Sequence, residues 1–232
     1  MANDYDEFDD GQSGMGPMAQ AMMSAIRARH PSWLSQTSQP DPVTAAAAGV
    51  LNLIGKHEAA GDPNAIGASW KSMMTPLPKA ASQTKIQDLI NWQRQPENTM
   101  ESVTVDPYKP FPDPGPQHAA VGLYQIKPNT LSGAAGALGL LDQPFTVENQ
   151  NRLGVKLLNG RQFTDYLTGK IGDADFTANA AKEWDSIPVD ANGLNRSGRK
   201  TQMSYQAWLD TLYQAKATYD AANGAGADDE TP

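Results

Sequence analysis

The sequence predicts an α+β domain that is mostly helical, with a small β-hairpin sheet at one side. Apolar residues recur at helical spacing through residues 43–60 and again through most of the chain after residue 128. Between these regions, residues 100–108 alternate polar and apolar side chains, and residues 119–126 form a second short strand-like run. A proline-rich loop separates the two runs, so the chain is expected to form helices around one hairpin.

The helices can be assigned in order along the chain. The first spans residues 43–60 and is expected to end at Gly61-Asp-Pro, because glycine and proline both interrupt helices. A second helix is expected to follow Ser82, a residue type that caps helix N-termini, and Thr146 is expected to cap a later one. The remaining helices are predicted over residues 128–138, 146–158, 161–171, 175–184 and 201–222.

Three regions of different character are predicted. Residues 1–42 form an acidic, flexible arm, residues 43–222 the folded domain, and residues 223–232 a mobile tail. Within the arm, one short segment places apolar residues at helical spacing, namely Met18, Met22, Met23 and Ile26. This segment is either an ordinary packing helix or a docking helix for a partner, since Met-rich faces adapt to many partners.

Composition excludes several classes of function. The net charge is -8, and the one basic cluster, residues 196–200, is too small for a nucleic-acid surface. No run approaches the roughly 18 apolar residues that a membrane-spanning helix needs. The N-terminus is acidic where a signal peptide would be basic, so export by the ordinary secretory route is not expected. There is no cysteine, hence no disulfide and no thiolate metal site.

Glu58 is the candidate catalytic residue. It lies at the end of the first predicted helix among apolar and small residues, where lost solvation favours the protonated carboxyl and raises its pKa. Such an acid suits the protonation of a glycosidic oxygen near neutral pH. The alternative is a surface glutamate that pairs with Lys56.

A zinc site is rejected. His57 and Glu58 begin the zinc-protease signature, but position 61, where the second histidine belongs, is glycine. The chain holds only 3 histidines, and one of them is in the arm. No metal and no cofactor are therefore predicted.

A second segment, Gly-Leu-Tyr-Gln-Ile, begins at Gly122. Read as an extended strand, it places Tyr124 on one face and Gln125 on the other, while Gly122 permits close approach of the backbone. A glutamine amide suits the N-acetyl and hydroxyl groups of amino sugars, and tyrosine offers a flat face to a sugar ring. The alternative is an ordinary half-buried hairpin.

These segments resemble those of a known family. Glu-Ala-Ala-Gly-Asp-Pro-Asn-Ala, beginning at Glu58, is similar to the catalytic stretch of lytic transglycosylases, and Gly-Leu-Tyr-Gln-Ile-Lys-Pro-Asn-Thr is similar to their second motif. A closer resemblance is to phage muramidases of the lambda endolysin type. It continues in the stretch from Leu138 to Phe145 and in Ala-Ala-Lys-Glu-Trp-Asp-Ser-Ile-Pro around Trp184, and it covers about residues 45–220.

The resemblance implies a lysozyme-like fold with the hairpin beside an active-site cleft. It also implies cleavage of the β-1,4 bond between N-acetylmuramic acid and N-acetylglucosamine in peptidoglycan. Glu58 would be the catalytic acid, and Gly122, Tyr124 and Gln125 would contact the glycan. Trp184 would either floor the cleft or belong to the core. Ala59 and Leu123 depart from the family pattern and leave the sugar contacts open.

The resemblance favours a transglycosylase, which needs one acid/base because the 6-hydroxyl of the substrate attacks. A hydrolysing lysozyme needs a second carboxylate, for which Asp62, Glu101 and Asp106 are candidates.

The expected setting is a phage particle, in which the enzyme would be a virion component, located in the tail, that opens the cell wall at infection. Its partners would be peptidoglycan glycan strands and, through residues 1–42, other virion proteins, with no nucleic acid and no membrane span. It would be located in the virion, or in the host cytoplasm before release. Three alternatives stay open: a free endolysin, a non-enzymatic structural virion protein, and a carbohydrate-binding module.

Overall fold

The structure is a computed structural model that describes residues 41–67, 74–100 and 117–224. Residues 1–40 of the predicted arm, the end of the tail and most of the predicted strand over residues 100–108 lie outside these residues. The described residues belong to one unit of the chain, which begins at Asp41.

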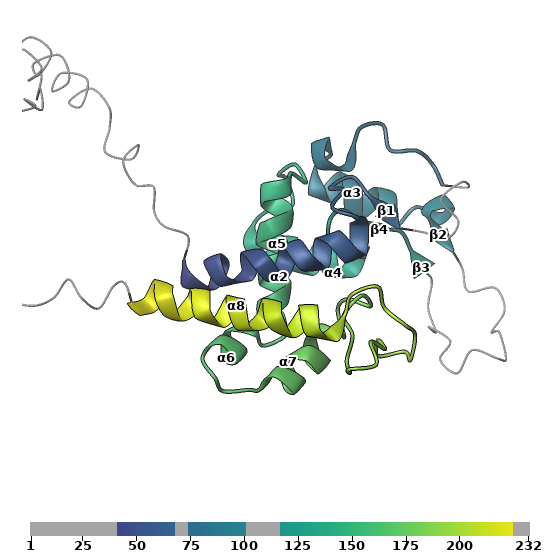
Figure 1. The fold of residues 1–232 in the computed structure, drawn as a ribbon. Coiled ribbons are helices and arrows are strands. Elements are labelled where there is room, and N and C mark those ends of the chain that lie inside the picture. Colours follow the sequence, from purple (N-terminus) through teal and green to yellow (C-terminus); the bar gives the residue numbers. More distant parts are fainter. Residues whose placement is uncertain (1–40, 68–73, 101–116, 225–232) are drawn as a thin grey trace, which may run out of the picture. The chain divides into compact units, whose positions relative to one another are not determined.

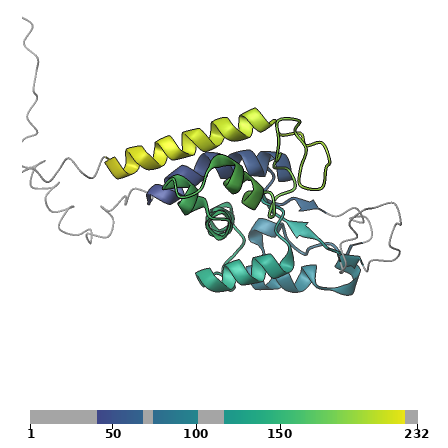
Figure 2. The same ribbon diagram turned by 90° about the horizontal axis from the view of Figure 1, so that it is seen from below.

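Two long helices lie side by side and antiparallel, as both views show (Figure 1 and Figure 2). The first, α2 (Pro42–Ala59), begins where the Asp41 carboxylate accepts a hydrogen bond from Thr44 N at 3.0 Å. It ends where Ala60 and Gly61 adopt left-handed backbone angles, with φ of 51° and 77°. The second, α8 (Tyr205–Gly224), packs its buried face against α2. The buried residues of these two helices include Val50, Ile54, Trp208 and Leu212.

A helical subgroup completes this half of the core. Helix α5 (Val147–Gly160) contacts both α2 and the short α6 (Phe163–Leu167), and α6 in turn contacts α7 (Asp173–Ala180) and α8. Rings from α6, α7 and α8 stack in series, with Phe176 6.2 Å from Trp208 between ring centroids. The Trp208 indole N–H donates to Thr177 Oγ1 at 2.9 Å, so these two buried polar groups satisfy each other.

The other half holds two helices and two short antiparallel strand pairs. Helices α3 (Ile86–Gln93) and α4 (Pro128–Leu138) pack together (Figure 2). Strand β1 (Ile66–Gly67) pairs with β4 (Ala120–Val121), and β2 (Thr99–Met100) pairs with β3 (Gln117–His118). The buried Gln93 amide donates to Ala119 O and Ile126 O, at 2.6 and 2.9 Å, and ties α3 to the residues on either side of β4.

The predicted class is confirmed at this level, because the described residues are mostly helical with small antiparallel strand pairs. The helices predicted over residues 43–60, 128–138 and 146–158 are present within two residues at each end. Thr146 caps α5 as expected, since its hydroxyl accepts from Asn149 N at 3.2 Å. No helix in the described ranges has the length and apolar character that crossing a membrane requires.

Several element predictions were wrong. Ser82 is not an N-cap, because it lies inside a short 3-10 helix (Ala81–Gln83) and α3 begins only at Ile86. The helix predicted over residues 161–171 is reduced to α6, because Gln162 adopts a left-handed φ of 69° before it. The helix predicted over residues 175–184 ends at Ala180.

Candidate active site

Glu58 lies on the last turn of α2 and is half-buried. Its Oε1 accepts a hydrogen bond from the backbone N–H of Ser186 at 3.1 Å. Ser186 follows α7, and it is 128 positions away in the sequence. The carboxyl is therefore held against a loop from the far end of the chain, and its helix ends immediately after it.

The surroundings of Glu58 favour the protonated form. Burial raises the pKa of this carboxyl, hydrogen bonds from Ser186 oppose that rise, and the nearby charge of Asp185 adds to it. Among the described residues no cation forms an ion pair with Glu58. Lys56 forms no ion pair with Glu58 among the described residues, so the interpretation as a Lys56-paired surface glutamate has no contact to support it.

The loop that contacts Glu58 was missed by sequence reasoning. Trp184 was the residue predicted from this stretch, either as the floor of the cleft or as part of the core. It is only 2% exposed and belongs to the core, so it presents no face to a ligand. Of the next two residues, Ser186 contacts Glu58, and Asp185 is close enough for its charge to affect the pKa of Glu58. The Trp-Asp-Ser-Ile-Pro stretch could have indicated this loop, but only its tryptophan was considered as a site residue.

The segment after Gly122 is a turn and not the predicted strand, which is a correction. Strand β4 stops at Val121, and Val121 and Ile126 pair across a four-residue turn. Gly122 and Gln125 take φ of 75° and 48°, so the alternation expected of a strand does not apply to Tyr124 and Gln125. A side chain at position 122 would also meet Phe145 and Gln150 within 2.5 Å, so the close approach assigned to Gly122 is made to the core.

Gln150 of α5 ties this turn to the segment that follows Glu58. Its amide nitrogen donates to Pro63 O and Phe145 O, at 3.0 and 2.9 Å. Its carbonyl oxygen accepts from Leu123 N at 2.8 Å. In addition, Gly122 N donates to Ala65 O at 2.8 Å. The two sequence motifs therefore contact each other through one fully buried side chain that sequence reasoning did not single out.

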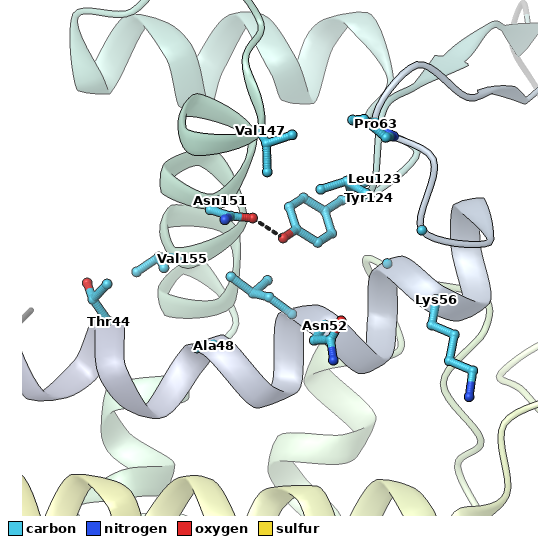
Figure 3. Close-up of a pocket in the computed structure, with 13 residues that line it drawn as sticks. Thr44, Ala48, Asn52, Lys56, Pro63, Leu123, Tyr124, Val147, Asn151 and Val155 are labelled. Atoms are coloured by element: carbon cyan, nitrogen blue, oxygen red, sulfur yellow. Dashed lines mark hydrogen bonds between the residues drawn. The ribbon is translucent and has the colours of Figure 1, made fainter. Parts of the chain in front are cut away.

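The Tyr124 side chain is buried and packs between α2 and α5. Its ring is 4% exposed, and its hydroxyl donates to Asn151 Oδ1 at 2.6 Å (Figure 3). A methyl group at Gly154 of α5 would approach Tyr124 Cε2 to 2.9 Å, so the helix needs glycine there. Burial raises the pKa of Tyr124 to about 12. Its position is that of a packing residue that also lines a cavity.

That cavity lies between α2 and α5 and has a volume of about 530 Å³. Tyr124 and Leu123 lie on one side of it (Figure 3). Gly55 and Gly61, which precede and follow Glu58 in the sequence, also line it. Glu58 itself does not line it. Residues close to Glu58 in the sequence therefore line the cavity, but Glu58 does not.

The other predicted residues have separate surroundings. Gln125 is half-buried, and its amide nitrogen donates back to Gly122 O at 2.9 Å, while its oxygen lies against Gly67 of β1. Asp62 is exposed and accepts from Asn64 N at 2.8 Å. Glu101 and Asp106 lie outside the described residues. In the described ranges no group of three or more His, Asp or Glu side chains is arranged to hold a metal ion.

Comparison of the sequence with protein-family models, with curated proteins and with solved structures found no match.

Proposed function

We propose that this protein is a lysozyme-like, phage-encoded enzyme that cleaves the β-1,4 bond between N-acetylmuramic acid and N-acetylglucosamine in peptidoglycan, with Glu58 as its acid. One observation supports this most directly: the Glu58 carboxyl ends α2, is partly removed from water, and has no cationic partner among the described residues. A carboxyl with a raised pKa is what protonation of a glycosidic oxygen requires. The resemblance of the two motifs to lytic transglycosylases supplies the substrate.

The chemistry follows from one acid that changes roles. Protonated Glu58 gives its proton to the glycosidic oxygen as the bond to C1 of N-acetylmuramic acid breaks. The carboxylate left behind is stabilised by the Ser186 N–H, since hydrogen bonds to an ionised group are the stronger kind. Glu58 then takes the proton of the 6-hydroxyl of the same sugar, whose oxygen attacks C1 and closes a 1,6-anhydro ring.

Hydrolysis is the second candidate, because Asp185 supplies a second carboxylate close enough for its charge to affect Glu58. The Asp185 side chain is 70% exposed and lies 3.5 Å from Arg199 Nη2. Mass spectrometry of muropeptides released from purified peptidoglycan separates the two reactions. Products with 1,6-anhydro ends support the transglycosylase reaction, and products with reducing ends would show that the reaction is hydrolysis.

A non-enzymatic role is favoured by a different observation. Tyr124 and Trp184 are buried and Gln125 folds back on its own turn, so these residues are explained by folding alone. Zymography of the wild type beside Glu58→Gln tests this alternative. Loss of a general acid should reduce clearing by about a hundredfold or more, whereas Glu148→Gln, an exposed glutamate on α5, should clear as the wild type does. Equal clearing by Glu58→Gln would exclude Glu58 from catalysis.

We further propose that the protein is a virion component, carried in the tail and docked through residues 1–42. The acidic, Met-containing character of that segment and the acidity of the whole chain motivate this, since an acidic enzyme gains little free attraction to an anionic wall. Western blotting of purified particles tests the location, and absence from them would favour an endolysin.

A further inference from the structure

The peptide group between Asp185 and Ser186 is held from both sides. Its N–H donates to Glu58 Oε1 at 3.1 Å, and its C=O accepts from the side-chain amide of Asn195 at 3.1 Å. Because these two groups belong to one planar unit, a hydrogen bond on the carbonyl fixes the direction of the N–H. It also polarises that N–H toward the carboxylate.

Asn195 is itself locked in place. It is 7% exposed, and its Oδ1 accepts from Ser197 N, Ser197 Oγ and Arg199 N, at 3.1, 2.8 and 2.9 Å. Its backbone N–H donates to Arg199 O at 2.7 Å. A side chain with this many bonds has one orientation, so its amide nitrogen can point only at the Asp185 carbonyl.

We infer that Asn195 is a positioning residue that holds the Asp185–Ser186 peptide so that the Ser186 N–H engages Oε1 of Glu58 and orients the carboxyl for proton transfer. Asn195 does not touch the carboxyl and acts through the peptide. The catalytic part of this inference rests on the proposed function, while the hydrogen-bond chain does not.

This series of hydrogen bonds matters because Glu58 has to work in both protonation states. Burial and the charge of Asp185 disfavour the carboxylate, and hydrogen bonds from Ser186 favour it. The neighbouring titratable groups are Lys56 and His57, which precede Glu58 on α2, and Arg199, which pairs with Asp185. Losing the Asn195 amide weakens the one backbone bond to the carboxyl, so Glu58 should bind its proton more tightly.

The test compares Asn195→Ala with Ser197→Ala. The first removes the amide donor, and the second removes one of the bonds to Asn195 Oδ1 but keeps the amide on Asp185. The first readout is the NMR titration of the Ser186 amide proton, whose chemical shift should follow the ionisation of Glu58. We expect Asn195→Ala to reduce the amplitude of this titration and move it to higher pH, and Ser197→Ala to leave it unchanged.

The second readout is kinetic. With peptidoglycan as substrate, Asn195→Ala should lower kcat about tenfold or more with KM unchanged, since misplaced catalytic groups affect the reaction step. The acidic limb of the pH profile should move upward with the NMR titration. An unchanged Ser186 titration, or an unchanged kcat in an active enzyme, would overturn the inference. If the wild type cleaves no peptidoglycan, the proposed function fails, and the NMR comparison alone decides the hydrogen-bond chain.

A second variant covers loss of folding in Asn195→Ala. Asn195→Asp keeps an oxygen for Ser197 and Arg199 and replaces the donor by an acceptor. Because position 195 is buried, salt does not screen the added charge, which raises the pKa of Glu58 by itself. The readout for this variant is therefore the amplitude of the Ser186 titration: a reduced amplitude supports the inference, and a wild-type amplitude overturns it.

Discussion

Replacement of Gln150 by leucine tests the link between the two motifs. Leucine has a similar size, so the change removes polar atoms and leaves little empty volume. Three hydrogen bonds are lost: those to Pro63 O and Phe145 O, and the one from Leu123 N. Each is worth about 1 kcal/mol net, and a buried partner left without a bond costs about 1–3 kcal/mol. We therefore expect the free energy of unfolding to fall by about 3–5 kcal/mol.

Urea denaturation followed by circular dichroism measures this loss. The transition midpoint should fall while the slope with denaturant stays the same, because the surface exposed on unfolding is unchanged. Gln214→Leu is the matched control, since Gln214 is an exposed glutamine on α8, and it should change stability by about 0.5 kcal/mol or less. A loss below about 1 kcal/mol for Gln150→Leu would refute the reasoning that this side chain holds the turn.

Three further predictions follow from the same packing. The pKa of Glu58 is raised in the folded state, so the folded protein loses stability as pH rises from the unfolded pKa through the folded pKa. Glu58→Gln should therefore be more stable than the wild type at neutral pH and no more stable than it well below the unfolded pKa. Thermal melts of both proteins across this pH range measure the difference. Gly154→Ala should lower the unfolding free energy by about 1–3 kcal/mol through overlap with Tyr124, whereas Gly136→Ala, where the added methyl meets nothing within 4 Å, should raise it by about 0.5–1 kcal/mol in urea titrations. Tyr124→Phe should cost about 1 kcal/mol because Asn151 loses its donor, and ultraviolet absorbance should show one tyrosine that ionises near pH 12 in the wild type but not in this variant.

The described fold unites residues that the candidate site needs from distant parts of the chain. Glu58 comes from α2 and Ser186 from the loop after α7, and Gln150 of α5 joins the segments on either side. If the proposed function holds, variants that loosen this loop should affect the reaction step more than substrate binding.

Local patterns were enough to predict several of the helices and the partial burial of Glu58. The apolar spacing before Gly61 predicted α2 and its end, and the hydroxyl of Thr146 predicted the start of α5, because both depend on interactions within a few residues. The position of Glu58 at a helix end among small residues indicated a carboxyl with a raised pKa, and the folded chain gives it one.

Tertiary structure decided everything that depends on distant partners. Gly122 and Gln125 have positive φ because the chain turns there to reach Ala65 and Gln150, and this turn buried Tyr124 instead of exposing its ring. Ser186 contacts Glu58 from more than a hundred residues away, and Asn195 contacts the peptide group that carries the Ser186 N–H. No local pattern encodes such contacts, because side-chain burial and hydrogen-bond partners are fixed only when separate helices pack together.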